Sequence, residues 1–392
     1  MEFKTYLIEQ LIKDISMGPF GSDLKKEVYQ SSGIPVLNGS NLIGFKLKED
    51  SFGYVSEEKA NQLKKCNALR GDIVVTHRGT LGQIVYIPYD SIFDRYLISQ
   101  SQFRFTCNDT LVIPEYLVYY FHTKIGQYKL LSNASQVGVP ALARATSTFK
   151  KIKIDIPPVC YQIEVMNILS SLDAKIETNN KLNEKLEEMA QAIFKSWFVD
   201  FEPFKNQPFY ETELGMIPEG WEIINLKEIV EENPKSKIKV SDARDNKGPY
   251  PFFTSGKSIL RYDDYLVDNF NVFLNTGGVA DIKFYIGKAN YSTDTWCIRG
   301  KEKCSTFLFY YLKNILEEIN FKYFEGSALK HLQKKKLLER KIIFPSTYIM
   351  KEYLEIVNPL LIQQSMQSKQ SQSLASLRDT LLPRLMSGEI KI

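Results

Sequence analysis

Residues 163–197 read IEVMNILSSLDAKIETNNKLNEKLEEMAQAIFKSW, and this stretch decides the fold. Its seam has a period of about 3.5 residues, which is typical of a coiled coil. The seam positions are Val165, Leu169, Leu172, Ile176, Asn179, Asn183, Leu186, Ala190, Ile193 and Trp197. Prolines stand before it and after it, at Pro157, Pro158 and Pro203, so we expect one helix of about 40 residues, roughly 60 Å long. The central asparagines are the kind of polar break that sets helix register.

The same design returns 188 positions later, where Pro345 takes the place of Pro157. The second seam consists of Tyr353, Val357, Leu360, Gln364, Gln367, Ser371, Leu374, Arg378, Leu381 and Leu385. Its polar centre lies at the same distance along the helix as Asn179 and Asn183 do in the first helix. We therefore expect the two helices to pair as an antiparallel coiled coil. The alternative is two unrelated core helices. Pro383 also predicts that the second helix kinks or ends early.

A globular segment with mixed strand and helix patterns precedes each long helix. In the first segment Ile73–Thr76 predicts a strand, Pro114–His122 predicts a helix, and residues 152–156 alternate as a half-buried strand. The second segment repeats this plan, because VFLNTG at residues 272–277 parallels VVTHRG at residues 74–79. Gly326-Ser327-Ala328 also precedes Pro345 by the same 19 positions that separate Gly138-Val139-Pro140 from Pro157.

The predicted fold class is therefore α/β, of the α+β type, with two pseudo-repeated globular domains and two long helices. The expected division is a domain at residues 1–156, a helix at 157–204, a second domain at 205–344 and a second helix at 345–392. A repeat of this size indicates duplication with diverged loops, because solenoid units are only about 20–50 residues long.

Composition sets broad limits on the class of protein. The chain has 392 residues and a formal charge of +4, which permits nucleic-acid binding without indicating it. Its five cysteines form no C-x-x-C pair and its three histidines are far apart, so we expect no metal site and a reducing, cytoplasmic location. The N-terminus does not resemble a signal peptide, and no apolar run approaches about 18 residues, so we expect no membrane association.

Motifs for catalysis are missing from the sequence. It contains no N-P-P-[YF] or D-P-P-Y string, which adenine amino-methylation would require. Residues 254–258, TSGKS, imitate the end of a phosphate loop, but Pro251 stands where that loop needs its first glycine. We therefore expect no catalytic residues, no metal and no cofactor in this chain.

Pairing the two helices would give the chain approximate two-fold symmetry, with a globular domain at each end of a rod. B-DNA has the same local symmetry, and half-sites one turn apart are about 34 Å from each other. Residues alone thus predict a two-headed binder with a fixed spacing. Because the loops of the two domains differ, each would recognise a different sequence.

Five strings carry a family resemblance that covers essentially the whole chain: GDIVVTHRGTLG at 71–82, IDIPP at 154–158 before the long helix, AQAIFKSWFVDFEPF at 190–204, LGMIPEGW at 214–221 and LRDTLLPRLMSGE at 377–389. With these strings the chain resembles the specificity subunit of a type I restriction–modification system. The resemblance implies two target recognition domains, helical spacers and a bipartite, asymmetric DNA site. It also implies docking of two methyltransferase subunits, joined by restriction subunits, which use S-adenosylmethionine, ATP and Mg²⁺. The alternatives are an orphan DNA-recognition protein of another defence system and a coiled-coil scaffold that binds proteins.

Candidate DNA contacts are chosen by residue type and loop position, because Arg and Lys suit guanine edges and phosphates, and small polar side chains suit bases or backbone. In the first domain they are Ser22, Asn38, Ser40, Asn41, His77, Arg78, Thr80 and Arg144. In the second they are Thr254, Ser255, Lys257, Asn275, Thr276, Lys330, His331, Gln333 and Lys334. For each of them the alternative is an ordinary solvated loop residue.

The outer faces of the helices are a second candidate surface, for docking partner subunits or simply for contact with solvent. Its members would be Glu184, Lys185, Glu187, Glu188, Lys195, Gln363, Lys369 and Arg378. The end of the first helix carries several aromatic side chains, which we expect to be buried against another part of the protein or a partner: Phe194, Trp197, Phe198 and Phe201. Either the second domain or a methyltransferase subunit could supply this cover.

Overall fold

The computed structural model describes residues 2–135, 138–326, 330–390 and 392, so Ser327 and Ala328 of the expected repeat lie outside the described residues. Contacts divide the chain into two compact units. The first unit consists of Met1–Lys175 and Ser373–Ile392, and the second of Ile176–Gln372. Each unit thus holds one globular domain and a part of each long helix. The expected boundaries at residues 156, 204 and 344 stay a prediction.

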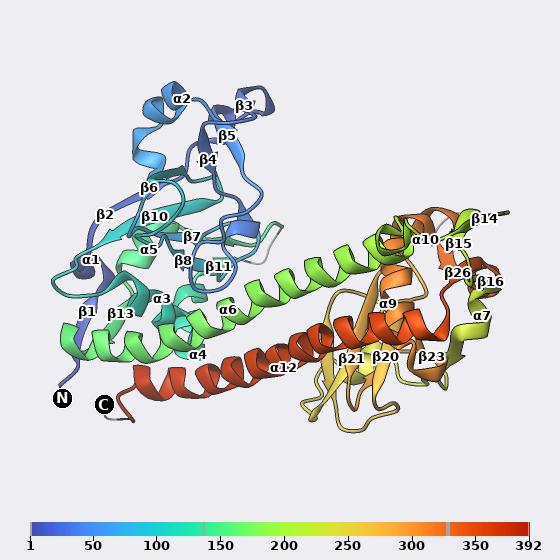
Figure 1. Ribbon diagram of the computed structural model, residues 1–392. Helices are drawn as coiled ribbons and strands as arrows, with labels where there is room; N and C mark the ends of the chain where they lie inside the picture. The colour runs from blue at the N-terminus through green and yellow to red at the C-terminus, as the bar shows by residue number, and fades with distance from the viewer. Residues whose placement is uncertain (1, 136–137, 327–329, 391) are drawn as a thin grey trace. The chain divides into compact units, whose positions relative to one another are not determined.

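Two sheets form the globular part of the first unit. An antiparallel sheet has the order β2 (Ile12–Met17), β10 (Gln102–Cys107), β7 (Ile73–Thr76) and β8 (Ile84–Tyr86) (Figure 1). A second, mixed sheet has the order β3 (Tyr29–Gln30), β5 (Gly53–Val55), β4 (Ile34–Val36), β9 (Arg95–Leu97) and β6 (Asn67–Leu69). Every residue of β7 is buried, as expected of a central strand with apolar residues on both faces.

Short helices pack on the two sheets of the first unit: the helix at Glu57–Gln62 adds Ala60 to the core of the mixed sheet, and the others pack with the antiparallel sheet. They are α1 (Ile8–Leu11), α2 (Glu57–Gln62), α3 (Pro114–His122), α4 (Lys124–Leu131) and α5 (Ala145–Lys150). The expected helix at Pro114–His122 is confirmed, with Pro114 at its first turn, where a missing amide proton is harmless. The remaining strands are β1 (Lys4–Leu7), paired with β13 (Lys153–Ile156), and β11 (Ala134–Ser135), paired with β12 (Ala141–Leu142).

The second unit repeats this architecture. Its antiparallel sheet has the order β17 (Val230–Glu232), β23 (Thr295–Gly300), β20 (Phe270–Asn275) and β21 (Ile282–Ile286), and β16 (Glu222–Asn225) pairs with β26 (Lys341–Phe344). The second sheet is smaller and consists of β19 (Ile259–Tyr262), β18 (Tyr250–Phe253) and β22 (Asn290–Tyr291). Two short hairpins join β14 (Phe209–Thr212) to β15 (Gly215–Pro218) and β24 (Phe324–Glu325) to β25 (His331–Leu332). The helices are α7 (Leu226–Ile229), α8 (Val240–Ala243), α9 (Ser305–Asn314), α10 (Leu316–Lys322) and α11 (Lys334–Leu338). The predicted duplication and the mixed α/β class are therefore confirmed.

The long helices are α6 (Val159–Phe198) and α12 (Thr347–Met386), of 40 residues each. In the first unit the Tyr161 hydroxyl on α6 donates to the Leu385 carbonyl of α12 at 3.1 Å. In the second unit Asn179 Nδ2 donates to Ser371 Oγ at 3.3 Å, and Asn183 Nδ2 donates to Ser368 Oγ at 3.1 Å. The partner number falls as the α6 number rises, so the helices pair antiparallel, as predicted.

Ten of the twenty predicted seam positions are buried, including Val165, Leu169, Asn179, Leu186, Gln364 and Leu385. The other ten are only half-buried: Leu172, Ile176, Asn183, Ile193, Trp197, Leu360, Gln367, Leu374, Arg378 and Leu381. Leu361 and Leu382 are buried more deeply than the predicted Leu360 and Leu381, because globular residues as well as the facing helix pack on α12. The expected early end at Pro383 is wrong. The helix continues to Met386, and the Pro383 carbonyl accepts the Ser387 amide at 3.0 Å.

The aromatic end of α6 is covered by the second unit itself. The Phe198 ring lies 5.0 Å from Phe307 and 5.7 Å from Trp221, and Phe194 lies 5.6 Å from Phe307, between ring centroids. The second globular domain therefore supplies the cover that the sequence required. Among the helices that the structure describes, none combines the length and the apolar character needed to cross a membrane.

Candidate nucleic-acid interface

Three loops of the first unit leave its antiparallel sheet at the same end. Met17 at the end of β2 pairs with Phe103, and Thr76 at the end of β7 pairs with Gln102, at the start of β10. In antiparallel pairs the end of one strand lies beside the start of its neighbour. Residues 18–23, 77–83 and 99–101 are therefore gathered at one edge.

Backbone hydrogen bonds join a fourth segment to this edge. The Leu142 amide donates to the His77 carbonyl at 2.8 Å, and the Gly79 amide donates to the Pro140 carbonyl at 2.8 Å. Arg78 pairs with Ala141 as an isolated β-bridge between these two bonds. Arg144, two residues beyond Leu142, is thereby held beside the loop that carries His77 and Arg78.

Gln83 attaches the loop at residues 38–41. Its Oε1 accepts from the Thr76 hydroxyl at 2.9 Å, and its Nε2 donates to the Gly39 carbonyl at 2.9 Å. We call residues 18–23, 38–41, 77–83, 99–101 and 140–144 the first loop edge. All eight candidate DNA contacts of the first domain lie within it.

Five candidates of the first loop edge are exposed: Ser22, Ser40, Arg78, Thr80 and Arg144. His77 is half-buried, its Nε2 lies 3.2 Å from the Gln100 carbonyl, and burial lowers the pKa of its imidazole. A neutral ring at neutral pH remains able to exchange hydrogen bonds with base edges.

Asn41 is different, because its side chain is completely buried. Its Nδ2 donates to the carbonyls of Lys48 at 3.0 Å and Asp50 at 2.7 Å, and its Oδ1 accepts the Asn38 amide at 2.9 Å. These bonds use its amide to shape the loop, so in this conformation Asn41 positions Asn38 and Ser40 and presents no atom to DNA.

Phe20 belongs to the first loop edge and was missed as a candidate. Its side chain is 83% exposed. The loop is nevertheless ordered by two bonds: the Phe20 amide donates to Asp23 Oδ2 at 3.1 Å, and the Asp23 amide donates back to the Phe20 carbonyl at 2.9 Å. A Cβ on Gly21 would stand 2.3 Å from Gln100 Oε1, which places this loop against Gln100. The sequence signal was the aromatic enclosed by Gly18-Pro19 and Gly21.

The second unit builds the same backbone frame. The Leu332 amide donates to the Thr276 carbonyl at 3.0 Å, and the Gly278 amide donates to the Lys330 carbonyl at 3.0 Å. Gly277 and His331 form the isolated bridge between them. We call residues 254–258, 276–281, 292–294 and 330–333 the second loop edge.

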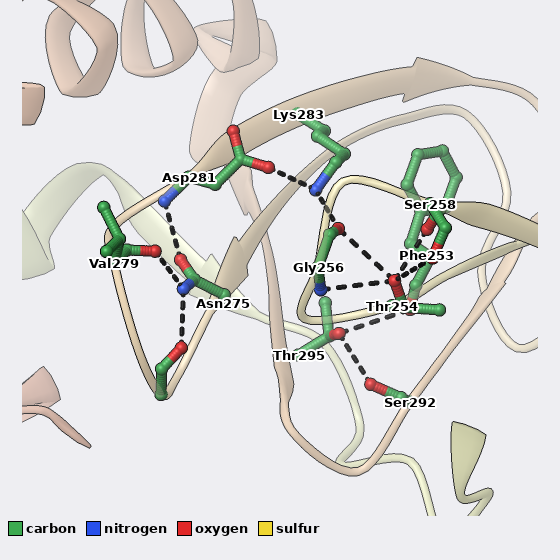
Figure 2. A network of polar contacts seen from close by, with 11 residues as sticks. Phe253, Thr254, Gly256, Ser258, Asn275, Val279, Asp281, Lys283, Ser292 and Thr295 are labelled. Atoms are coloured by element: carbon green, nitrogen blue, oxygen red, sulfur yellow. Dashed lines mark hydrogen bonds and ion pairs between the residues drawn. The ribbon is translucent and has the colours of Figure 1, made fainter. Parts of the chain in front are cut away.

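Two candidates of the second domain hold this edge together from inside (Figure 2). Thr254 is buried, and its hydroxyl donates to the Ser258 carbonyl at 2.6 Å. Asn275 is also buried; its Nδ2 donates to the carbonyls of Gly277 and Val279, and its Oδ1 accepts the Asp281 amide at 2.7 Å. Like Asn41, both side chains shape loops rather than face outward.

Lys283 joins the two loops of Figure 2. Its ammonium donates to the Gly256 carbonyl at 2.8 Å and pairs with Asp281. The loop at 254–258 is thus tied to the loop at 276–281, although about twenty residues separate them in the sequence.

The outward members of the second domain's candidates are Lys257, Lys330 and His331, with Ser255, Thr276 and Gln333 half-buried. Lys334 lies with its ammonium 5.2 Å from the centre of the Trp296 ring, and burial lowers its pKa. The side chains at matching places therefore differ between the edges: by the backbone frame His77 and Arg78 correspond to Thr276 and Gly277, one residue further along than the sequence parallel predicted.

Several residues expected on the outer faces of the helices contact the globular domains instead. In the first unit Arg378 donates to Asp173 and lies with its guanidinium carbon 4.8 Å from the centre of the Phe45 ring. Asp173 also accepts the Tyr119 hydroxyl from α3. In the second unit Lys369 donates to the Ile286 carbonyl at 2.9 Å.

Glu187 has the corresponding place in the second unit. Its carboxylate accepts the Tyr310 hydroxyl from α9 at 3.1 Å and lies 3.3 Å from Lys313. Arg378, Lys369 and Glu187 therefore join globular domain to helix, and Glu184, Lys185, Glu188, Lys195 and Gln363 remain exposed.

Within residues 2–135, 138–326, 330–390 and 392, no group of three or more His, Cys, Asp or Glu side chains could hold a metal ion. Burial raises the pKa of the Cys107 and Cys297 thiols, which keeps both protonated at neutral pH.

Comparison with known proteins gives a consistent result. The family model for the type I restriction modification DNA specificity domain matches residues 14–188 and 218–375. The MjaIX type I restriction enzyme specificity subunit of Methanocaldococcus jannaschii is 28% identical over 417 residues, which cover 97% of this chain and 93% of the relative. The HindI specificity subunit of Haemophilus influenzae is 30% identical over 185 residues, 45% of this chain and 38% of the relative.

A solved structure shares the fold. The crystal structure of the type I restriction–modification S subunit from M. genitalium aligns with a TM-score of 0.62, over 98% of this chain and 96% of its own, at 18% identity. The two matches of the family model fall on the two copies of the repeat, so each copy has its own specificity domain.

Proposed function

The chain belongs to the type I restriction–modification specificity subunit family, and from this premise we propose that each of its two recognition domains reads one half of a bipartite, asymmetric DNA site. The observation that carries the proposal is the shared frame with different side chains. Two edges with the same backbone approach DNA in the same way, whereas their unlike side chains recognise unlike bases.

The first loop edge presents arginine and the second presents lysine and histidine. Arg78 and Arg144 can each donate two bonds to a guanine edge from a planar guanidinium, with His77 beside them, whereas Lys257 and Lys330 bring compact ammonium groups and His331 brings an imidazole. The exposed serines and threonines suit phosphates, which fix position without specifying sequence. We assign Phe20 to the DNA surface too, because an apolar side chain at such an edge can pack against bases or wedge between them.

The paired helices are proposed to set the distance between the half-sites and to dock two methyltransferase subunits. Support for the spacer role comes from their antiparallel seam and its buried polar centre around Asn179 and Ser371, which fixes register. The exposed face with Glu184, Lys185, Glu188 and Lys195 is available for docking. Restriction subunits would join this complex.

We further propose that the chain is not itself an enzyme and carries no cofactor. Methyl transfer with S-adenosylmethionine, and translocation and cleavage with ATP and Mg²⁺, would belong to the partner subunits. The purified chain alone should transfer no methyl groups. It should bind duplex DNA with an affinity that falls with salt, since phosphate contacts release counterions. A protein-binding scaffold would show no such salt dependence.

The decisive experiment is methylation mapping across the genome of cells that express this chain with a type I methyltransferase subunit. A split motif with two unlike halves and a fixed gap is the expected result. Absence of any new methylated motif, with a methyltransferase subunit that is active beside its own specificity subunit, would reject the proposal and favour an orphan reader or a scaffold.

A further inference from the structure

A basic hollow opens between α4 and α5 of the first unit. Its volume is about 590 Å³, and its lining contains four cationic side chains and no acidic one: Lys129, Arg144, Lys151 and Lys153 carry the charge. None of these four forms an ion pair with a carboxylate in the part of the chain that the structure describes. Four positive charges around one hollow repel each other, so an anion placed among them would lower the energy.

In the corresponding region of the second unit, four basic side chains are paired with carboxylates. There α10, α11 and β26 take the places of α4, α5 and β13. Lys322 lies 2.9 Å and Arg340 2.6 Å from Glu318, Lys336 lies 2.8 Å from Glu325, and Lys341 lies 2.5 Å from Glu213. In the first unit, by contrast, none of the four cations that line the hollow has a carboxylate partner among the described residues, and this difference points to a ligand.

The hollow begins where the first loop edge ends. Arg144 belongs to both, because the Leu142 amide is bound to the His77 carbonyl two residues earlier. A molecule bound on the first loop edge could thus extend into the hollow and place an anionic group there. This continuity favours a polymer with regularly spaced charges over an isolated ion.

We propose that the hollow binds the sugar–phosphate backbone of the DNA whose bases the first loop edge reads, an inference that rests on the proposed function. Lysine ammonium groups neutralise phosphates as compact charges, and the exposed Ser147 hydroxyl can donate to a phosphate oxygen. Tyr128 lines the hollow and is 77% exposed, so its ring can cover a deoxyribose. The volume is far larger than one phosphate needs and fits a segment of backbone.

The test uses the complex of the full chain with its methyltransferase subunits and the double variant Lys151→Gln, Lys153→Gln. Both side chains are exposed, so the fold should persist. Loss of two phosphate contacts should weaken binding to specific and unrelated duplexes alike, by roughly tenfold to thirtyfold at physiological salt, and should reduce the salt slope by about 1 to 2. The methylated motif should not change.

The matched control is Lys336→Gln, Lys341→Gln, which removes the same charge from the second unit, where carboxylates already neutralise it. The control should leave affinity and slope nearly unchanged. Equal behaviour of the two double variants would overturn the proposal, and so would a loss confined to the specific duplex.

A free anion is distinguished by titrating inorganic phosphate into the complex without DNA. Phosphate binding at micromolar concentration that the Lys151→Gln, Lys153→Gln variant loses, with DNA affinity unchanged, would assign the hollow to a small anion and refute the backbone contact. Failure of the proposed function itself would look different, because the unmodified complex would then methylate no split motif.

Discussion

The Leu142 amide donates to the His77 carbonyl, and Leu332 donates to Thr276 in the same way in the second unit. These bonds hold the loops that follow β7 and β20 against the segments near residues 141 and 331. Hydrogen bonds between backbone atoms do not depend on the side chains. The side chains of a loop edge can therefore change without loss of the frame, which under the proposed function would let one architecture serve two different half-sites.

Replacement of His77 and Arg78 by alanine should alter recognition of one half-site only. A good bidentate contact discriminates between bases by about 1–3 kcal/mol, so the methylated motif should become degenerate at one or two positions of that half. Methylation mapping of the variant complex measures this. Lys330→Ala with His331→Ala is the matched change at the second loop edge and should relax the other half. Equal loss at both halves would contradict two independent readers.

Phe20→Ala should weaken DNA binding by about tenfold, because packing of an aromatic ring against bases contributes on the order of 1–3 kcal/mol. The thermal stability of the protein should not change, since the ring is 83% exposed. Binding is measured by titration of duplex DNA into the complex. Phe321→Ala, a ring that is 84% exposed on α10 and outside the second loop edge, is the control and should bind like the unmodified protein. A Phe20 variant of normal affinity would remove this residue from the interface.

Asp173→Ala should destabilise the first unit by about 2 kcal/mol, because the Tyr119 hydroxyl and the Arg378 guanidinium both lose their acceptor. The Asp173 and Arg378 side chains are only 24% and 17% exposed, so water replaces the lost bonds poorly.

All three tryptophans, Trp197, Trp221 and Trp296, lie in the second unit, so tryptophan fluorescence would not report this change. Hydrogen exchange of the α3 amides is the suitable measurement. Asp379 is the other carboxylate partner of Arg378, and the Asp379 side chain is 64% exposed. Asp379→Ala should therefore lower the free energy of unfolding by less than about 0.5 kcal/mol. Similar exchange rates in the two variants would show that Asp173 does not join α3 to the helices.

Acidification should destabilise the first unit through His122. Burial lowers the pKa of its imidazole and the positive Arg378 lowers it further, and together they outweigh the hydrogen bond between Nε2 and the Ile84 carbonyl at 2.9 Å, which raises the pKa. The folded state therefore binds a proton at His122 more weakly than the unfolded state, whose histidine has a pKa of about 6.5. The free energy of unfolding should be highest above that pH and should decrease as the pH falls below it. Hydrogen exchange of α3 at pH 7.5 and pH 5.5, corrected for intrinsic rates, measures the loss. His122→Gln should reduce this pH dependence. An unchanged dependence would place its origin elsewhere, with His77 the next candidate because burial lowers its pKa too.

Seven residues inserted after Asn180 in α6, together with seven before Gln370 in α12, should widen the gap between half-sites by about 3 base pairs. Seven helical residues add roughly 10 Å, and base pairs are about 3.4 Å apart. The two insertions fall at the same height, because Asn179 Nδ2 donates to Gln370 Oε1 at 2.9 Å. A heptad in each helix preserves the seam. Insertion into α6 alone should break the pairing and abolish methylation. If the double insertion leaves the gap unchanged, the helices are not the spacer.

Much of the architecture was accessible from the sequence because it depends on periodicity and repetition. The 3.5-residue seam predicted two paired helices, and the 188-residue offset predicted two similar domains, which the equal strand orders confirm. Both signals arise from local patterns that each segment carries by itself.

The direction in which individual side chains face was decided by tertiary contacts. Asn41, Thr254 and Asn275 are polar loop residues like Ser40, yet they turn inward to satisfy carbonyl groups supplied by their folded loops. Leu361 rather than Leu360 is fully buried, because globular residues as well as α6 pack on α12.

The basic hollow shows the same division between local pattern and fold. The sequence determined by itself that Lys151 and Lys153 precede one long helix as Lys341 precedes the other. Only the folded chain decided that Lys341 meets Glu213, more than a hundred residues away, whereas Lys151 and Lys153 meet no carboxylate in the described part of the chain. Charge pairing depends on distances in space, and such distances between remote residues exist only after the chain has folded.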